Sequence, residues 1–363
     1  MTDLRVSVLL VSWNTREQTR RCLASLEAAA RPDVSYEVLA VDNGSRDGSA
    51  ELLETWPGVH LLRNEANLGY ARAVNQAYLR AGGEFVLLLS TDVCLRPGAL
   101  AAMARFLANR PGAAGVVPLF LSSVPPGSLD QHYRHFPTPR TELASFTAFG
   151  RLPGFRGPLR RHLMCDDDFS EPRVVDAPVS ACLLLRRSTL SPDHILDERL
   201  PLYANDTLLA RSLAERGHTL WVTPDAVVAH TAGGSTRLLD PSVRSQHQIG
   251  SFVRYLQMTE PDTSLRLFRA GMWVDWLART VTGRRRRLRR RALAAALRGE
   301  LPPLPDAPLG ATTAPRAGAP EPARTAREST LSSAATTPSN GQAGTTAHHA
   351  DQRAPHPAER SGP

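Results

Sequence analysis

A single acidic side chain follows an apolar segment near residue 90. The stretch VLLLSTDVCLRPGAL (86–100) begins with four apolar residues, which predict a buried strand, and continues through Ser90 and Thr91 to Asp92. A turn follows, because a Pro-Gly pair is typical of turns. Open parallel sheets bind their ligands at the strand ends. Asp92 is therefore a candidate ligand-binding carboxylate.

Small polar residues close the other predicted strands of the first half in the same way. If these ends converge on one crevice, their side chains form a binding site. Asp42 can accept hydrogen bonds from a base or a ribose, Gly69 lets the backbone approach a ligand, and Arg72 can pair with phosphate. The segments DNGSRDGS and NLGY are also typical of a turn and of a helix entry. The further candidates are Ser12, Asn14, Asn43 and Asn67.

The elements that must position these side chains alternate between strand and helix. This order predicts an α/β fold with a mostly parallel central sheet and helices on both faces. The predicted strands are 5–13, 36–44, 59–64 and 84–92, and the predicted helices are 15–30, 49–56, 70–83 and 98–110.

The second half is less regular. Residues 120–170 are rich in Pro, Phe and Arg, and we expect an insertion or a substrate loop there. Residues 181–190 predict a strand followed by a helix, 205–217 a helix that ends at Gly217, and 220–230 an extended segment.

Several site classes are excluded. No GxGxxG follows the first strand, so a dinucleotide site of the Rossmann type is not expected. A phosphate loop ending in Gly-Lys is impossible, because all 43 basic residues are Arg. SWNTREQ (12–18) contains no glycine, which argues against a nucleotidyltransferase. The four Cys form no CxxC pair, and we expect neither a zinc site nor disulfides.

The net charge of +8 is concentrated in the run RRRRLRRR at 284–291, while the rest of the chain is near neutral. Residues 261–300 predict an amphipathic, Arg-rich extension. Its Arg run either holds an anionic membrane surface or is a solvated helix end. Specific nucleic-acid binding is not expected, because the run lacks interleaved aromatic residues. Residues 301–363, rich in Pro, Ala and Thr, predict a disordered tail.

Four blocks of the first half resemble the successive blocks of glycosyltransferase family 2, in its bacterial rhamnosyltransferase-like branch. They are VSVLLVSWNTREQTRRCLASL, VLAVDNGSRDGSAELL, LLRNEANLGYARAVNQAY and FVLLLSTDVCLRPGAL, and the segment from ACLLLRRSTL to HTAGGST resembles the second half. The resemblance implies a GT-A fold over 1–260, with a nucleotide-sugar-binding half at about 1–115 and an acceptor or catalytic half at 116–260.

The resemblance also implies an activity: inverting transfer of a sugar, with rhamnose as the first choice, from a nucleotide-diphosphate donor to a cell-surface glycan or lipid-linked acceptor. The donor would be a dTDP- or UDP-sugar, the acceptor a glycan or a polyprenyl-linked sugar, and the cofactor a divalent metal, Mg²⁺ or Mn²⁺. We expect a cytoplasmic location, peripheral on the inner face of the plasma membrane.

Site residues follow from the same resemblance. Asp42 would lie in the nucleotide pocket, with Ser12 and Asn14 near the base. Asp92 matches the last acid of the metal-binding motif, and His230 matches a histidine near the diphosphate and the metal. A further acid, Asp206, matches the general base, whose task suits a carboxylate because the attacking hydroxyl must lose a proton.

Three positions depart from the family pattern. Ser90 stands where Asp or Asn is usual, Asn205 where Glu is usual, and Leu208 where a further acid is common. Each departure weakens metal binding or base placement. They favour an alternative, a catalytically weakened nucleotide-sugar or glycan-binding protein on the same fold.

Overall fold

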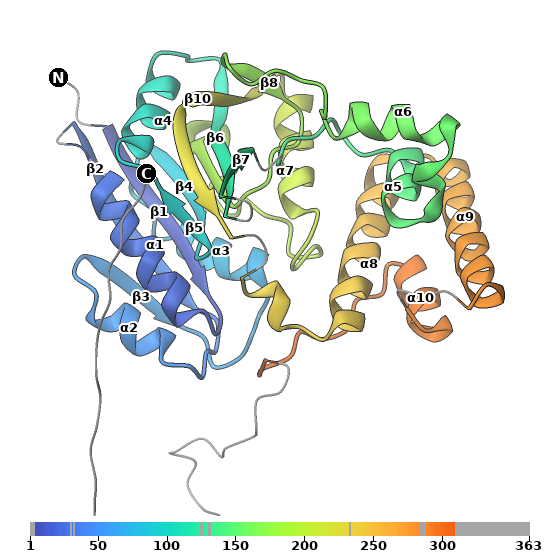
Figure 1. The fold of residues 1–363 in the computed structure, drawn as a ribbon. Coiled ribbons are helices and arrows are strands. Elements are labelled where there is room, and N and C mark those ends of the chain that lie inside the picture. Colours follow the sequence, from blue (N-terminus) through green and yellow to red (C-terminus); the bar gives the residue numbers. More distant parts are fainter. Residues whose placement is uncertain are drawn as a thin grey trace, which may run out of the picture. The chain divides into compact units, whose positions relative to one another are not determined.

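The computed structural model describes residues 4–29, 31, 33–123, 126–129, 132–231, 234–283 and 288–308. Its central sheet has the strand order β3-β2-β1-β4-β9-β6-β10-β5. The strands are β1 (Leu4–Ser12), β2 (Val34–Asp42), β3 (Val59–Arg63), β4 (Phe85–Ser90), β5 (Val93–Leu95), β6 (Ala113–Ser123), β7 (Pro126–Leu129), β8 (Arg173–Val175), β9 (Cys182–Arg186) and β10 (Thr219–His230) (Figure 1).

The first four strands of that order are parallel, as the alternation of elements predicts. β1 pairs with β2 and β4, and β2 pairs with β3, all in parallel. The register sets Ser12 opposite Asp42, and Asp42 opposite Arg63, so these strands end on one edge of the sheet. β9 is antiparallel to both β4 and β6, and it joins the parallel set to the β6–β10 pair. The fold thus delivers several strand ends to one place.

Helices flank this sheet. In the first half they are α1 (Arg16–Ala29), α2 (Ser49–Thr55), α3 (Tyr70–Tyr78) and α4 (Ala99–Ala108). The connections from β1 to β2 and from β2 to β3 move in one direction along the sheet, through α1 and α2. The connection from β3 to β4, through α3, moves in the opposite direction. Because such connections are right-handed, α3 lies on the opposite face of the sheet. Strands β1 and β4 are accordingly buried along almost their whole length, as expected for strands covered on both faces.

Residues 120–170, where an insertion or a substrate loop was expected, contain regular helices. Beyond β6 and β7 they contain α5 (Pro139–Phe146), a 3-10 turn η1 (Ala148–Arg151) and α6 (Pro153–His162). Both helices begin with Pro at their first position, where its fixed φ suits a helix. The Pro-rich composition that suggested a loop therefore marks two helix starts.

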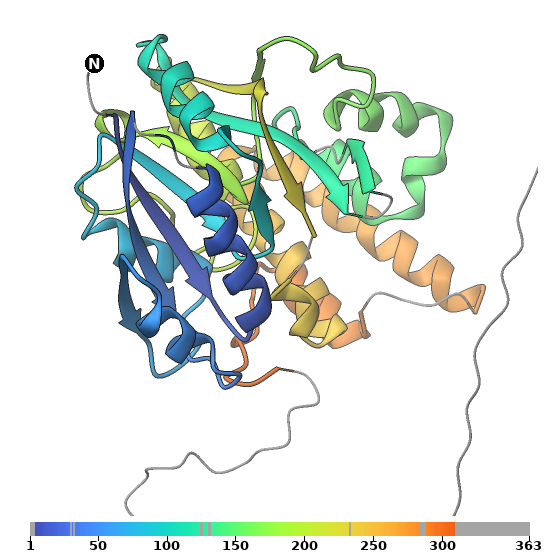
Figure 2. The same ribbon diagram turned by 60° about the vertical axis from the view of Figure 1, so that its left-hand side comes forward.

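These two helices and the C-terminal helices form a second lobe with its own core (Figures 1 and 2). The C-terminal helices are α8 (Pro241–Thr259), α9 (Asp262–Val281) and α10 (Arg290–Leu297), reached after α7 (Asn205–Glu215) and the 3-10 turn η3 (Thr236–Leu238). α5 packs against α9 and α10 against α8. Phe268 is buried in this core and Trp273 and Trp276 pack against it, so the expected extension is joined to α8 by a shared core.

Two further predictions differ from the structure, and two predicted segments lie partly outside the described residues. Helix α3 ends at Tyr78, before the Gly82-Gly83 pair, because Leu79 and Arg80 close it as a turn. After β9, residues Arg187–Thr189 form a single 3-10 turn, η2. Residues 284–287 of the Arg run, and 309–363 of the expected tail, lie outside the described residues. In the described part, no helix is long and apolar enough to cross a membrane.

Candidate active site

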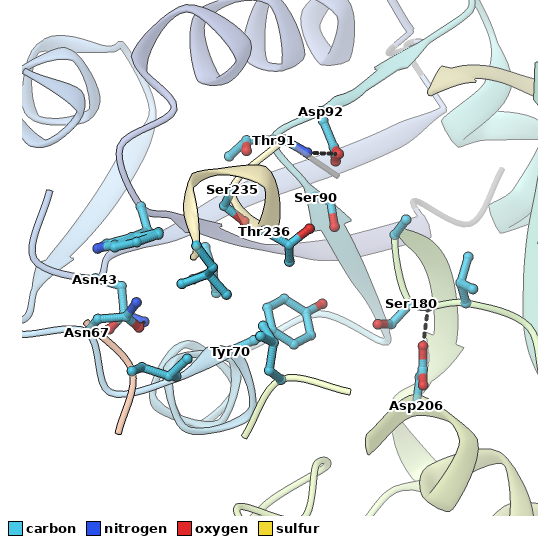
Figure 3. A pocket seen from close by; sticks show the side chains of 18 of the residues that line it. Asn43, Asn67, Tyr70, Ser90, Thr91, Asp92, Ser180, Asp206, Ser235 and Thr236 are labelled. Carbon is cyan, nitrogen blue, oxygen red and sulfur yellow. Dashed lines mark hydrogen bonds between the residues drawn. The ribbon is translucent and has the colours of Figure 1, made fainter. Parts of the chain in front are cut away.

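The strand ends surround a cavity of about 240 Å³ (Figure 3). Five sequence-predicted residues line it, and they come from separate parts of the chain. They are Asn43, Asn67, Asp92, Asp206 and His230. The cavity is also lined by residues that sequence reasoning did not select, among them Trp13, Tyr70, Ser180 and Thr236. Trp13 and Tyr70 directly follow selected residues or motifs, while Ser180 lies in an irregular segment that carries no signal.

Asp92 lies where β4 gives way to β5. Its Oδ2 accepts a hydrogen bond from the Gly234 N–H at 2.9 Å and lies 3.5 Å from Nε2 of His230. Burial raises the pKa of the Asp92 carboxyl, but the interaction with His230 and the Gly234 N–H outweigh it, so the pKa lies below its ordinary value. The Asp92 carboxylate is therefore ionised at neutral pH and able to bind a cation.

His230 ends β10 and is held by a second histidine. Its Nδ1 lies 2.9 Å from Nε2 of His132, and the two rings are arranged edge to face. Phe120 packs against both rings. Because Nδ1 is engaged by His132, Nε2 of His230 is directed at Asp92. His132 lies in the segment expected to be a loop, and nothing in its sequence context indicated this role.

Asp206 lies in the first turn of α7, on another side of the cavity from Asp92 (Figure 3). Its Oδ2 accepts a hydrogen bond from the Ser180 N–H at 3.2 Å, and its Oδ1 accepts one from the Thr207 N–H at 2.8 Å. Ala204, just before the helix, has a φ of 62°, in the left-handed region. These contacts fix the carboxylate against the cavity that also contains Asp92.

Asp42 lies beside the cavity and is almost fully buried. Its Oδ2 accepts a hydrogen bond from the Ser45 N–H at 2.9 Å, while no described residue is a hydrogen-bond partner of Oδ1. Burial is the largest influence on this carboxyl, and it raises the pKa above the ordinary value. Oδ1 is thus a buried acceptor with no hydrogen-bond partner among the described residues, and Asp42 is absent from the cavity lining.

The amides of Asn43 and Asn67 belong to a structural network. Nδ2 of Asn43 donates to Oδ1 of Asn67 at 2.9 Å, and Oδ1 of Asn43 accepts from Asn64 and from the Leu68 N–H. The Asn67 side-chain oxygen also accepts from the Gly69 N–H. This network joins the ends of β2 and β3 to the start of α3. Both amides therefore shape the cavity wall as well as lining it.

Besides Asp42, four predicted residues do not line the cavity. Ser12 is buried and its hydroxyl lies within 3.2 Å of those of Thr15 and Thr19, so it contributes to packing of α1. Asn14 has a φ of 51° and accepts a hydrogen bond from the Arg46 N–H. Arg72 is exposed on α3.

Gly69 is the fourth of these residues, and its neighbour is protein rather than an open cavity. It has a φ of 89°, and a Cβ there would come within 3.0 Å of Cβ of Pro201. The Ala71 N–H donates to the Pro201 carbonyl beside it. Glycine is needed here because the backbone is left-handed and the 201 segment is close.

The three departures have distinct surroundings. Ser90 lines the cavity at the end of β4. Asn205 is buried, and its Nδ2 donates to the Leu200 carbonyl at 3.1 Å, a bond that a Glu carboxylate in its ionised form cannot make. Leu208 packs against the core of the second lobe. Asn205 and Leu208 thus serve local packing and hydrogen bonding.

The cavity offers few ligands for a metal ion. Across the described ranges, no group of three or more His, Cys, Asp or Glu side chains could hold a metal. Asp92 and His230 nevertheless present a carboxylate oxygen and an imidazole nitrogen 3.5 Å apart. Mg²⁺ is commonly bound through one or two carboxylates together with substrate phosphates and water. The two side chains fit a metal that depends on the ligand's own diphosphate.

Residues 7–163 match the family described as glycosyl transferase family 2. These residues form a family 2 glycosyltransferase domain. The chain is 28% identical over 271 residues to the N-acetylglucosaminyl-diphospho-decaprenol L-rhamnosyltransferase of Mycobacterium tuberculosis, in a match that covers 70% of this chain and 84% of the relative. The chain is therefore rhamnosyltransferase-like in sequence, as the sequence blocks predicted.

Of two similar solved structures, the first shows the same fold. GalNAc-T7, solved with UDP, GalNAc and Mn²⁺, is matched with a TM-score of 0.51 and 16% identity over 70% of this chain and 48% of that chain. The mannosyltransferase PcManGT from Pyrobaculum calidifontis, solved with GDP-Man and Mn²⁺, is matched with a TM-score of 0.47 and 19% identity, over 81% and 79% of the two chains. The glycosyltransferase has the GT-A fold that the sequence predicted.

Proposed function

We propose that this enzyme transfers a sugar from a nucleotide-diphosphate donor to a hydroxyl of a lipid-linked acceptor, with inversion at the anomeric carbon. One observation carries the proposal: Asp92 and Asp206 line one cavity from different elements. The first carboxylate suits a cation on the leaving diphosphate, and the second suits a base for the incoming hydroxyl. A direct displacement needs these two charges on either side of the reacting sugar.

The protein side of the mechanism uses four side chains and one backbone N–H. Asp42 accepts a hydrogen bond from the nucleoside at Oδ1, beside the cavity. Asp92 and His230 would hold Mg²⁺ or Mn²⁺, which neutralises charge on the diphosphate when bound. Asp206 accepts the proton of the acceptor hydroxyl, and the Ser180 N–H keeps its carboxylate oriented. Such general-base help is typically worth ~10²–10⁴-fold in rate.

The substrates are proposed from the mycobacterial relative. Its name specifies rhamnosyl transfer to N-acetylglucosaminyl-diphospho-decaprenol. We assign rhamnose as the first candidate sugar, with dTDP as its carrier and a UDP-sugar as the alternative donor. The acceptor is a polyprenyl-diphosphate-linked sugar on the way to a cell-surface glycan.

A membrane contact suits such an acceptor, and helix α9 has an outward face of the required kind. Leu267, Val274, Leu277 and Val281 lie on one stripe of this helix and are 74%, 54%, 54% and 87% exposed. Its opposite face carries Leu265, Phe268 and Met272, which are buried in the second lobe. The helix is therefore apolar on both sides, and the outward side needs a cover.

The charge beside α9 favours an anionic lipid surface as that cover. Arg289, Arg290 and Arg291 are exposed at the start of α10, and no ion pair joins them to an acid in the described part of the chain. Each such cation contributes about 1 kcal/mol near an anionic membrane. We propose a peripheral location on the inner, cytoplasmic face of the plasma membrane, through 284–291 and the outward stripe of α9.

Nucleotide binding tests the catalytic proposal first. The full chain is titrated by calorimetry with UDP, dTDP and GDP, each with and without Mn²⁺ or Mg²⁺, beside Asp92→Ala. We expect one nucleotide to bind in a metal-dependent manner and Asp92→Ala to lose that dependence. Binding of no nucleotide under any condition contradicts the proposal.

A second candidate function rests on Ser90 and Asn205, which stand where the family usually has Asp or Asn and Glu, respectively. It is a nucleotide-sugar or glycan-binding protein with little or no catalysis. This function predicts donor binding without turnover, and no effect of Asp206→Asn on any measured property of the donor complex. Sugar transfer that depends on Asp206 excludes it.

A further inference from the structure

A basic cavity adjoins the reaction cavity on the side of His230. It has a volume of about 600 Å³ and lies between the end of β10, η3 and the start of α8. Val179, His230 and Thr236 line both cavities, so the two lie next to each other. What distinguishes the second cavity is its pair of cations, Arg237 on η3 and Arg244 in the first turn of α8.

Among the described residues, neither of these cations has an anionic partner. In the parts of the chain that the structure describes, no acidic residue lines the cavity, and no ion pair or side-chain hydrogen bond engages Arg237 or Arg244. Arg244 is half-buried. Burial of Tyr203, in the same cavity, raises the pKa of its hydroxyl, and the positive charge of Arg244 partly offsets this rise. Two unpaired guanidinium groups facing one cavity form a site for an anion with several oxygens.

A third cavity links this basic site to Asp206. It has a volume of about 300 Å³, and its lining includes Ser180, Asp206, Tyr203 and Gln248. Tyr203 and Gln248 also line the basic cavity. Asp92 and the nucleotide-side residues Trp13 and Asn67 line neither of these two cavities. A ligand whose hydroxyl reaches Asp206 can thus extend toward the two arginines, away from the donor.

We infer that Arg237 and Arg244 bind the diphosphate of the acceptor, while the acceptor sugar occupies the space between them and Asp206. The inference rests on the proposed function, because a diphosphate-linked acceptor is part of it. One guanidinium group can bind two phosphate oxygens at once. Two guanidinium groups also match the negative charge of a diphosphate diester. The donor diphosphate is assigned to Asp92 and His230, so the two diphosphates have separate sites.

The test compares two probes that share one sugar. One is a synthetic N-acetylglucosaminyl-diphosphate with an octyl tail, and the other is octyl N-acetylglucosaminide, which lacks the diphosphate. Both are titrated into the wild type, the double variant Arg237→Gln/Arg244→Gln and the control Arg80→Gln, whose exposed arginine follows α3. Affinities for UDP and dTDP are measured on the same proteins, and thermal melting checks that each variant is folded.

We expect the double variant to bind the diphosphate probe roughly 10- to 100-fold more weakly, as loss of charge-assisted hydrogen bonds requires. Its affinity for the octyl glycoside and for both nucleotides stays at the wild-type value, as does every affinity of the control. An equal loss of nucleotide affinity assigns the arginines to the donor and overturns the inference. Unchanged affinity for the diphosphate probe overturns it as well.

Failure of the proposed function gives a different result from failure of the arginine site. In that case the wild type binds neither nucleotide and transfers no sugar, whatever the arginine variants do. A wild type that binds nucleotide and transfers sugar, together with a double variant indistinguishable from it, rejects the arginine site alone.

Discussion

The Asp206 carboxylate and the Ser180 backbone are joined by a hydrogen bond of 3.2 Å at the edge of the reaction cavity. This bond comes from a main-chain N–H, so it is independent of the side chain at 180. The bond holds the Asp206 carboxylate in one orientation, in which it can accept a hydrogen bond, as a general base for a hydroxyl requires.

Asp206→Asn keeps the size and removes the basicity of this side chain. We expect sugar transfer to fall by ~10²–10⁴-fold, because the acceptor hydroxyl loses its base. Nucleotide affinity should remain unchanged. Initial rates with a diphosphate-linked acceptor and calorimetry with UDP and dTDP measure the two properties. An Asp206→Asn variant as fast as the wild type would remove Asp206 from the mechanism.

His132→Gln tests the support of His230. Partners that orient a metal-binding histidine are typically worth ~10–100-fold in metal affinity. We expect the Mn²⁺ concentration needed for nucleotide binding to rise by that factor, while metal-free binding stays unchanged. His60→Gln, at an exposed position on β3, is the matched control. Equal metal requirements in both variants would assign His132 to packing only.

Buried His247 predicts an acid-sensitive second lobe. Burial lowers the pKa of this α8 residue to about 4, from 6.5. In the unfolded chain this imidazole binds a proton below about pH 6.5, whereas in the native protein it does so only below about pH 4. The free energy of unfolding therefore decreases as the pH is lowered from about 6.5 to about 4. The contribution is roughly 3 kcal/mol when fully expressed. Chemical denaturation from pH 7 to 4 measures it, and His247→Leu should flatten the slope.

Leu277→Glu/Val281→Glu tests the outward face of α9. Two charges on the stripe should abolish much of the binding to vesicles that contain anionic lipid, without lowering the melting temperature, because both side chains are more than half exposed. Vesicle co-sedimentation measures the loss. Thr263→Glu, near the other end of the same helix, controls for added charge. Undiminished sedimentation of the double variant would exclude the stripe from the contact.

Gly69→Ala tests a constraint of the backbone rather than of the ligand. At a φ of 89° an alanine is strained, and its Cβ would press on Pro201. We expect the free energy of unfolding to fall by about 1–3 kcal/mol. Gly58→Ala is the matched control, since Gly58 has a φ of 73° and open space around it. A similar loss in both would leave only the backbone conformation as the cause.

The first half of the fold and the outline of the site were predictable because local signals agree there. Apolar runs, turn residues and caps set β1 to β4, and the parallel order then brings Asp92 and Asn43 to one edge. The resemblance to a family added Asp206 and His230, which no local pattern singles out. Both line the cavity with Asp92.

The remainder depended on contacts between distant segments. His132 acquires its position from packing against Phe120 and against His230, which lies far along the chain. Ser180 contributes a backbone N–H, which has no sequence signature. The helices at 139–162 were hidden by composition, because their prolines mark helix starts as readily as loops.

The second lobe has a consequence for building chimeras of this enzyme. Phe146 of α5 and Phe252 of α8 line the cavity beside Asp206 and pack on each other, with ring centroids 5.8 Å apart. α5 also packs against α9, beyond the expected boundary at residue 260. The second lobe is therefore discontinuous in sequence, and segments 132–162 and 241–300 have to be swapped as a pair.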